Sequence, residues 1–256
     1  MSDMDPTGEV DDAPAMTVDI VSDVVCPWCY IGKRRLEAAL ATREGPLPAI
    51  RWHPFQLNPD MPKEGVGHVD YLAEKFGGPQ RAVQMMLQVA EHARQAGAEI
   101  DMDKCRHLPN TLDAHRVIHW AGIEGKQTPM VSRIMRAHWK EGANIGDPAT
   151  LARLAGEVGM DPTAVARLLA TDADADDIQS RDMDARQKGV TAVPTFLIAQ
   201  QYVVSGAQPP EMWRDVIDEL TAQAQGWGPP PPAPHPPRGG GGGGVCRRGA
   251  RPGGPG

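Results

Sequence analysis

The sequence predicts an α/β fold in which a βαβ unit and a later αββα unit flank a long, all-helical insertion. Three observations carry this prediction. An alternating, β-branched run over residues 17–25 leads directly into helical spacing. Apolar residues then recur at helical intervals over about residues 63–171, without a convincing strand pattern. Two short strand-like runs and a final amphipathic stretch follow over residues 195–224.

The βαβ unit comes first. After the strand over residues 17–25, Pro27 stands in the first turn of a predicted helix, where its missing N–H costs no hydrogen bond. Trp28, Ile31 and Leu36 continue the helical spacing, and Lys33 to Arg35 are expected on its solvated face. Residues 50–57 are predicted to form the second strand, closed by an Asn-Pro-Asp turn.

The insertion shows repeated apolar stripes. The clearest has the spacing i, i+3, i+4, i+7, i+8 and comprises Val131, Ile134, Met135, His138 and Trp139. After the insertion, an acidic helix is expected over residues 174–188, ended by Gly189. Strands over 195–199 and 202–205 and a helix over 210–224 complete the predicted order.

Composition divides the chain into four parts. Residues 1–15 hold five acids and no base and are expected to be a disordered leader. Residues 16–62 and 172–225 form the expected α/β domain, and residues 63–171 the inserted helical domain. Residues 226–256 are rich in proline and glycine and are expected to be a disordered tail.

Charge and hydropathy restrict the partners. The formal net charge is −7, and four arginines but no acid follow Gln225, so the predicted domains are strongly acidic. An acidic surface repels nucleic acid and anionic membranes, and neither is expected as a partner. We find neither an apolar run of membrane-spanning length nor the pattern of a secretory signal, which predicts a cytoplasmic protein.

The motif with the clearest chemistry is Cys26-Pro27-Trp28-Cys29. The first sulfur stands at a predicted helix start, where backbone N–H groups and the helix dipole favour the thiolate, the attacking species in disulfide exchange. Cys29 lies one turn further and is expected to remain a thiol and to resolve the mixed disulfide. Both cysteines are therefore the expected catalytic residues.

Two other interpretations of the pair stay open. A zinc site needs four ligands, whereas Cys105 and Cys246 are isolated in the sequence, and no metal is expected. Two core cysteines by coincidence would leave the preceding strand and the intervening proline unexplained.

Val193-Pro194 is the second candidate element of the site. It follows a predicted helix and precedes a strand, which matches the cis-proline loop that faces the Cys-x-x-Cys motif in thioredoxin-type folds. A cis bond before proline is uncommon in folded proteins, at about 5–6%. A trans proline that merely begins a strand is the alternative.

With these motifs identified, the chain resembles the FrnE-like group of the DsbA family over about residues 16–225. The matching stretches are Ser22 to Lys33, Pro54 to Pro59, Pro109 to Thr111 with Ala114 to Arg116, Val193 to Phe196, and Ser205 to Gln208. The resemblance implies a thioredoxin fold with a helical insertion, and disulfide oxidoreductase or isomerase activity without a bound cofactor. It also implies that substrates contact Pro27, Trp28, Val193, Pro194 and Asn110, with glutathione as a candidate co-substrate.

The chain departs from that group at two points. Ala192 stands where the group usually has glycine, and the tail after Gly226 matches nothing in the family pattern, so Cys246 is expected to be a free thiol without an inherited role. Asn110 also fits a helix N-cap, and His115 and Arg116 fit either the cleft between the domains or a solvated turn.

Two rival functions stay open. Kappa-class glutathione transferases and 2-hydroxychromene-2-carboxylate isomerases resemble this architecture but typically carry serine at the position of Cys26. A redox-responsive binding protein or holdase would use the cleft without turnover. The expected partners are disulfide-containing proteins or small thiols, and the chain is expected to be a monomer or homodimer.

Overall fold

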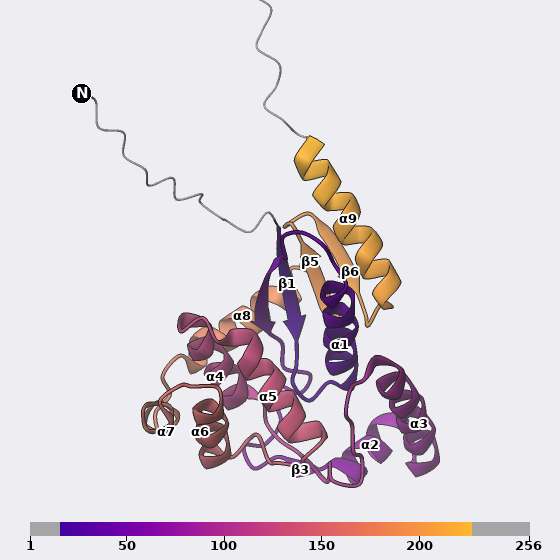
Figure 1. Cartoon of the computed structure of the whole chain (residues 1–256). Helices are drawn as coiled ribbons and strands as arrows, with labels where there is room; N and C mark the ends of the chain where they lie inside the picture. The colour runs from indigo at the N-terminus through magenta and orange to yellow at the C-terminus, as the bar shows by residue number, and fades with distance from the viewer. Residues whose placement is uncertain (1–15, 227–256) are drawn as a thin grey trace, which may run out of the picture.

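A computed structural model describes residues 16–226 (Figure 1). The predictions for the leader, for the tail from residue 227 onward and for Cys246 lie outside the described residues. Within residues 16–226, no helix is both long and apolar enough to cross a membrane.

A four-stranded mixed sheet forms the α/β part, with the strand order β2-β1-β5-β6. Its strands are β1 (Thr17–Ser22), β2 (Ala49–Pro54), β5 (Thr195–Ile198) and β6 (Tyr202–Ser205). β1 is parallel to β2 and antiparallel to β5, and β6 is antiparallel to β5. Ile20 is paired with Trp52 on one side and Phe196 on the other, so alternate residues of three strands build one apolar face.

Three helices pack around this sheet. α1 (Pro27–Ala41) and α9 (Pro210–Gly226) contact each other to one side of the strands, and α8 (Ala175–Gln187) lies to the other side (Figure 1). Trp213 of α9 is fully buried and meets Phe196 edge to face, with 4.5 Å between ring centroids. The predicted βαβ and αββα units are therefore confirmed, on a single apolar core.

The segment between β2 and α8 is the predicted insertion. Its helices are α2 (His68–Phe76), α3 (Pro79–Ala96), α4 (Leu112–Ile123), α5 (Gln127–Trp139), α6 (Pro148–Glu157) and α7 (Pro162–Leu169). The Asp-Pro pairs begin α6 and α7, because each aspartate accepts hydrogen bonds from backbone N–H groups of the first turn and each proline follows at N1. The apolar stripe predicted over residues 131–139 is buried in α5.

Three details differ from the sequence prediction. The insertion is not purely helical, because β3 (Val66–Gly67) and β4 (His107–Leu108) pair as a two-residue antiparallel ladder. β1 ends at Ser22 because a turn follows in which the Cys26 N–H donates to the Asp23 carbonyl. β2 ends at Pro54, whose nitrogen has no hydrogen to extend a ladder.

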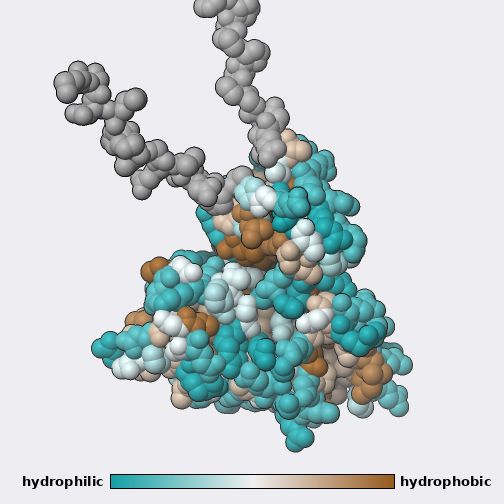
Figure 2. Space-filling model, viewed as in Figure 1, coloured by the Kyte–Doolittle hydropathy of each residue, from teal (hydrophilic) through white to brown (hydrophobic). Residues whose placement is uncertain are grey.

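The surface in Figure 2 is mainly hydrophilic, with several apolar patches. One patch lies over the α2–α3 region, where Val83 and Leu87 of α3 are 59% and 66% exposed. Solitary exposed apolar residues of this kind are common on proteins of this size.

Candidate active site

The Cys26-Pro27-Trp28-Cys29 motif forms the junction between β1 and α1. Cys26 is the N-cap of α1 with an extended backbone (φ −87°, ψ 115°), and Pro27 is the first helical residue. The N–H groups of Cys29 and Tyr30 both donate to the Cys26 carbonyl, which winds the first turn so that both sulfurs lie near its start. Among residues 16–226, no side chain caps this turn and no acid lies in it, so the local field favours a negative charge on the Cys26 sulfur.

Both thiols are free and nearly buried, with Cys26 4% and Cys29 1% exposed. Burial raises the pKa of Cys29 well above its usual value, and the hydrogen bond with Cys26 and the negative charge of Asp23 raise it further. Cys29 is therefore a thiol at neutral pH. This asymmetry matches a nucleophile followed by a resolving thiol.

The Val193-Pro194 peptide bond is cis, as the sequence predicts. The loop lies against the motif, because the Cys26 sulfur is 3.6 Å from the Val193 carbonyl oxygen. Two hydrogen bonds fix the loop: the Gly206 N–H donates to the Pro194 carbonyl at 2.8 Å, and the Thr195 hydroxyl donates to the Ala192 carbonyl at 2.7 Å. Residues almost 170 positions apart in the chain thus build one site.

Gly32 of α1 permits this close approach. A Cβ at residue 32 would lie 3.1 Å from the Pro194 Cγ and 3.4 Å from the Phe196 ring. We expect Gly32→Val to lower the free energy of unfolding by about 1–3 kcal/mol through overpacking and to slow disulfide exchange by displacing the loop. Urea unfolding and the exchange rate measure the two effects. Gly32→Ala is the matched control, since its gain in helix propensity of about 1 kcal/mol offsets the tight contact. Equal unfolding free energies and exchange rates of the two variants would contradict the proposed crowding.

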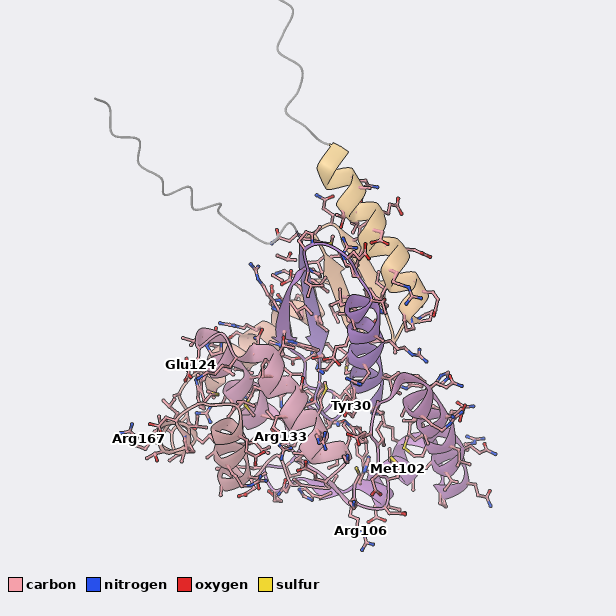
Figure 3. The ribbon with its side chains drawn as sticks, in the orientation of Figure 1. Tyr30, Met102, Arg106, Glu124, Arg133 and Arg167 are labelled. Carbon is pink, nitrogen blue, oxygen red and sulfur yellow. The ribbon has the colours of Figure 1, made fainter. Side chains whose placement is uncertain are left out.

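The inserted domain supplies one wall beside the motif. The partly exposed Trp28 ring packs at 5.1 Å from the ring of His92, which belongs to α3. Arg35 of α1 lies 3.3 Å from the His92 ring nitrogen and also donates to the Ala207 carbonyl, at the other end of the site. Tyr30, labelled in Figure 3, marks the place where α1 meets the insertion. Trp28 was predicted from the sequence as a residue of the site, whereas His92 and Arg35 were not. Their contact with each other beside Trp28 depends on the folded insertion.

A buried carboxylate lies directly behind the motif. Asp23 is 0% exposed, and its Oδ2 accepts hydrogen bonds from the Leu57 N–H at 2.8 Å and the Thr111 hydroxyl at 3.5 Å. Its Oδ1 lies 3.5 Å from the Nε2 of His115, which is buried on α4. Asp23 was not predicted as functional from the sequence. An acid directly beside the apolar pair Val24-Val25, at the end of a predicted strand, is a signal that could have drawn attention to it.

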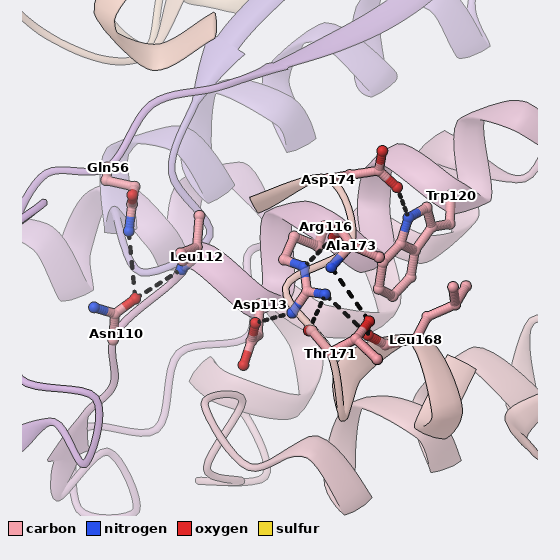
Figure 4. Close-up of polar contacts among 10 residues, drawn as sticks. All are labelled: Gln56, Asn110, Leu112, Asp113, Arg116, Trp120, Leu168, Thr171, Ala173 and Asp174. Carbon is pink, nitrogen blue, oxygen red and sulfur yellow. Dashed lines mark hydrogen bonds and ion pairs between the residues drawn. The ribbon is translucent and has the colours of Figure 1, made fainter. Parts of the chain in front are cut away.

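Asn110 and Arg116 hold the framework around the site together (Figure 4). The Asn110 side chain donates to the Met61 carbonyl at 2.7 Å and accepts from the Leu112 N–H at 2.9 Å. The N-cap of α4 is Thr111, so the N-cap alternative for Asn110 was wrong by one residue. Arg116 is 3% exposed, pairs with Asp113, and donates to three carbonyls between α7 and α8. Arg116 thus ties α4 to that connection and does not lie on a solvated turn.

Cys105 lies in the insertion, where its sulfur is within 3.3–3.4 Å of the His138 and Trp139 carbonyl oxygens. Burial raises the pKa of Cys105 to about 12, so this thiol is unreactive at neutral pH. Within residues 16–226, no three histidine, cysteine or acidic side chains gather in a way that could hold a metal ion.

Comparison with known proteins agrees with this geometry. The model of the DSBA-like thioredoxin domain matches residues 17–218. The chain belongs to this family. The paired thiols at the start of α1 make it a thiol–disulfide oxidoreductase, while the narrower FrnE-like grouping stays a prediction.

Individual relatives extend this comparison. A structure described as a probable DsbA oxidoreductase from Streptomyces coelicolor is 30% identical, with a TM-score of 0.73 over 81% of this chain and 91% of that one. The uncharacterized protein YwbO of Bacillus subtilis (strain 168) is 28% identical over 79% of this chain and 96% of its own length. The cytosolic disulfide reductase DsbM of Pseudomonas aeruginosa, solved with GSH, is 21% identical with a TM-score of 0.59 over 80% of this chain and 99% of that one, a likeness that shows the shared fold.

Proposed function

We propose that the chain catalyses dithiol–disulfide exchange with Cys26 as the nucleophile and Cys29 as the resolving thiol. One observation carries this proposal. Cys26 is the N-cap residue of α1, no side chain of the described residues hydrogen-bonds to the first turn of that helix, and the cis-proline loop lies opposite, while burial keeps Cys29 protonated. This arrangement separates the two chemical roles of an otherwise symmetric cysteine pair.

The reaction proceeds in two balanced steps. The Cys26 thiolate attacks one sulfur of a substrate disulfide, forming a mixed disulfide and releasing the other sulfur as a thiolate. Cys29 then loses its proton and attacks the Cys26 sulfur, which forms the Cys26–Cys29 disulfide and releases the second substrate thiolate. Two electrons pass from the protein dithiol to the substrate. Asp23, whose negative charge raises the pKa of Cys29, is the proposed proton acceptor in the second step.

Substrate binding is assigned to the groove around the motif. Backbone groups of the Val193-Pro194 loop pair with an extended segment beside the reacting disulfide. Val193 supplies them, because Pro194 has no N–H and its carbonyl accepts from the Gly206 N–H. Pro27 and the partly exposed Trp28 contact the same segment, and Trp28 with His92 forms its wall. For Asn110 we propose an indirect role, because its side chain is engaged in framework hydrogen bonds.

The substrate class we propose is protein disulfides or mixed disulfides of small thiols. Glutathione serves as co-substrate in this proposal, since Arg35 lies beside the wall of the groove and the structural relative DsbM was solved with GSH. The reaction needs no bound cofactor, because the electrons reside on the two cysteines. We place this chemistry in the cytoplasm, where thiols are kept reduced.

A coupled reduction assay tests the proposal. The protein is supplied with dithiothreitol and either insulin or glutathione disulfide, and the loss of substrate disulfide is followed. We expect acceleration over dithiothreitol alone, retained in Cys105→Ser because that thiol is unreactive. Glutathione conjugation without disulfide turnover would instead indicate a transferase, and binding without either reaction a holdase; both outcomes would refute the proposal.

A further inference from the structure

A small pocket lies behind the sheet edge, away from the cysteine motif. It has a volume of about 20 Å³ and is lined by residues of β1, β2, α4, α5 and α8, among them Ser22, His53, Pro54, His115, His119 and Arg181. A volume of this size holds about one water molecule, provided that polar partners surround it. The histidines and Arg181 supply such partners. Neither cysteine of the motif nor Pro194 lines this pocket.

The inner end of this pocket is formed by a side chain with an unused hydrogen-bonding atom. His115 is 4% exposed, and its Nε2 is completely buried without a hydrogen-bond partner. The nearest charged atom is Oδ1 of Asp23, 3.5 Å away, which is likewise buried and unpartnered. Buried polar atoms without hydrogen-bond partners are costly in a folded core, and a role in proton transfer is one reason for a protein to retain them.

We propose that His115 is a positioning residue that carries the Cys29 proton from Asp23 to the pocket, which neither cysteine of the motif lines. This inference rests on the proposed function. Asp23 takes the proton when Cys29 attacks Cys26, and His115 accepts that proton at Nε2 and releases a proton from its other ring nitrogen to water in the pocket. Imidazole suits this step because it has two nitrogens that exchange donor and acceptor roles. The reverse transfer returns a proton to Cys29 when the disulfide is reduced.

The surrounding charges distinguish His115 from its neighbours. His53 on β2 is held by Asp19 at 2.8 Å, and Arg181 on α8 pairs with Asp177 and lies 3.4 Å from a ring nitrogen of His119. On α5, the ring of His138 is also buried, with an unpartnered Nε2. Burial lowers the pKa of His138 to about 3, so that ring stays neutral near neutral pH and does not take up a second proton. His115 alone among these residues both faces the Asp23 carboxylate and lines the pocket.

The test compares His115→Gln with His138→Gln, a matched substitution of an equally buried histidine. The preformed mixed disulfide at Cys26 is mixed rapidly with buffers of pH 6 to 9, and its resolution by Cys29 is followed. General acid–base groups typically contribute about 10²–10⁴-fold; for this relay we expect a loss of about 10-fold or more in His115→Gln at pH 7. The loss should shrink toward pH 9, where hydroxide removes the proton directly. His138→Gln should keep the wild-type pH profile, and alkylation of Cys26 should be unchanged in both.

Two further measurements remove the ambiguity of a destabilised variant. In His115→Ala, added imidazole should restore the resolution rate, because removal of the ring enlarges the pocket for it. In the wild-type protein, the resolution step should slow about twofold or more in D₂O, whereas the attack of Cys26 should not. A wild-type step insensitive to D₂O would overturn the relay. So would a His115→Gln loss that is equal at every pH together with a failure of imidazole to restore the rate of His115→Ala. If wild-type protein forms no Cys26–Cys29 disulfide at all, the proposed function fails instead.

Discussion

Cys26→Ser is expected to lose disulfide exchange down to the uncatalysed background. A serine hydroxyl at the same N-cap does not ionise near neutral pH and forms no bond to sulfur under these conditions, so the first step has no nucleophile. Cys29 cannot replace it, because burial raises its pKa well above the usual range. The rate of insulin or glutathione disulfide reduction by dithiothreitol measures the loss.

The fold is expected to survive this change, since serine caps helices well and Cys26 contributes no side-chain cap of its own. Circular dichroism and urea unfolding of Cys26→Ser serve as the control for folding. Cys105→Ser serves as the control for cysteine removal, because Cys105 lies in the insertion with its sulfur against carbonyl oxygens. Substantial exchange by Cys26→Ser would exclude Cys26 as the nucleophile.

Cys29→Ser is expected to stop the reaction after its first step. Cys26 still attacks, but no resolving thiol follows, so mixed disulfides with substrate accumulate and turnover falls to the rate at which external thiol releases them. Non-reducing electrophoresis and intact mass spectrometry detect these adducts, at one substrate per chain.

The contrast between the two variants is the informative part of this experiment. The Cys26→Ser, Cys29→Ser double variant is prepared with Cys246→Ser as well, because Cys246 is expected to be a free thiol. It should form no adduct, which excludes trapping at Cys105. If the Cys26→Ser protein formed adducts on Cys29 as fast as the Cys29→Ser protein forms them on Cys26, the two cysteines would not have the separate roles that the burial of Cys29 implies.

Local sequence signals were sufficient for the order of the elements in the α/β domain and for the helix start that carries the cysteine pair. Proline after Cys26 fixes the start of α1, and that start places both thiols on one turn. The Val193-Pro194 loop was also predicted correctly as cis, since its position between a helix and a strand matched a known arrangement. In each case, residues adjacent in the chain determine the local backbone.

Features that depend on long-range packing were not predictable in the same way. Lys33 was expected on a solvated helix face, yet it is 4% exposed and pairs with Glu37, and burial lowers its pKa. Its burial comes from neighbours that are distant in sequence, and helical periodicity does not describe them. The two-residue ladder of β3 and β4 gives no periodic signal at all, because it is shorter than one alternation.

The inserted domain contributes more to the site than a sequence pattern reveals. It supplies His92 beside Trp28, and also His115 behind Asp23. It also supplies the Trp139 indole, which donates to the Val24 carbonyl at 3.1 Å two residues before Cys26. The loop that presents the nucleophile is thus held by the insertion as well as by the sheet.

The most direct test of the account is the order in which the two thiols react. The fully reduced Cys246→Ser protein is treated at pH 7 with less than one equivalent of iodoacetamide, and peptide mapping locates the first alkylation; the substitution removes the free thiol expected at residue 246. The account predicts modification at Cys26, with Cys29 protected until the protein is unfolded. Equal modification of both residues, or earlier modification of Cys29, would contradict the claim that the start of α1 activates one sulfur while burial keeps the other protonated.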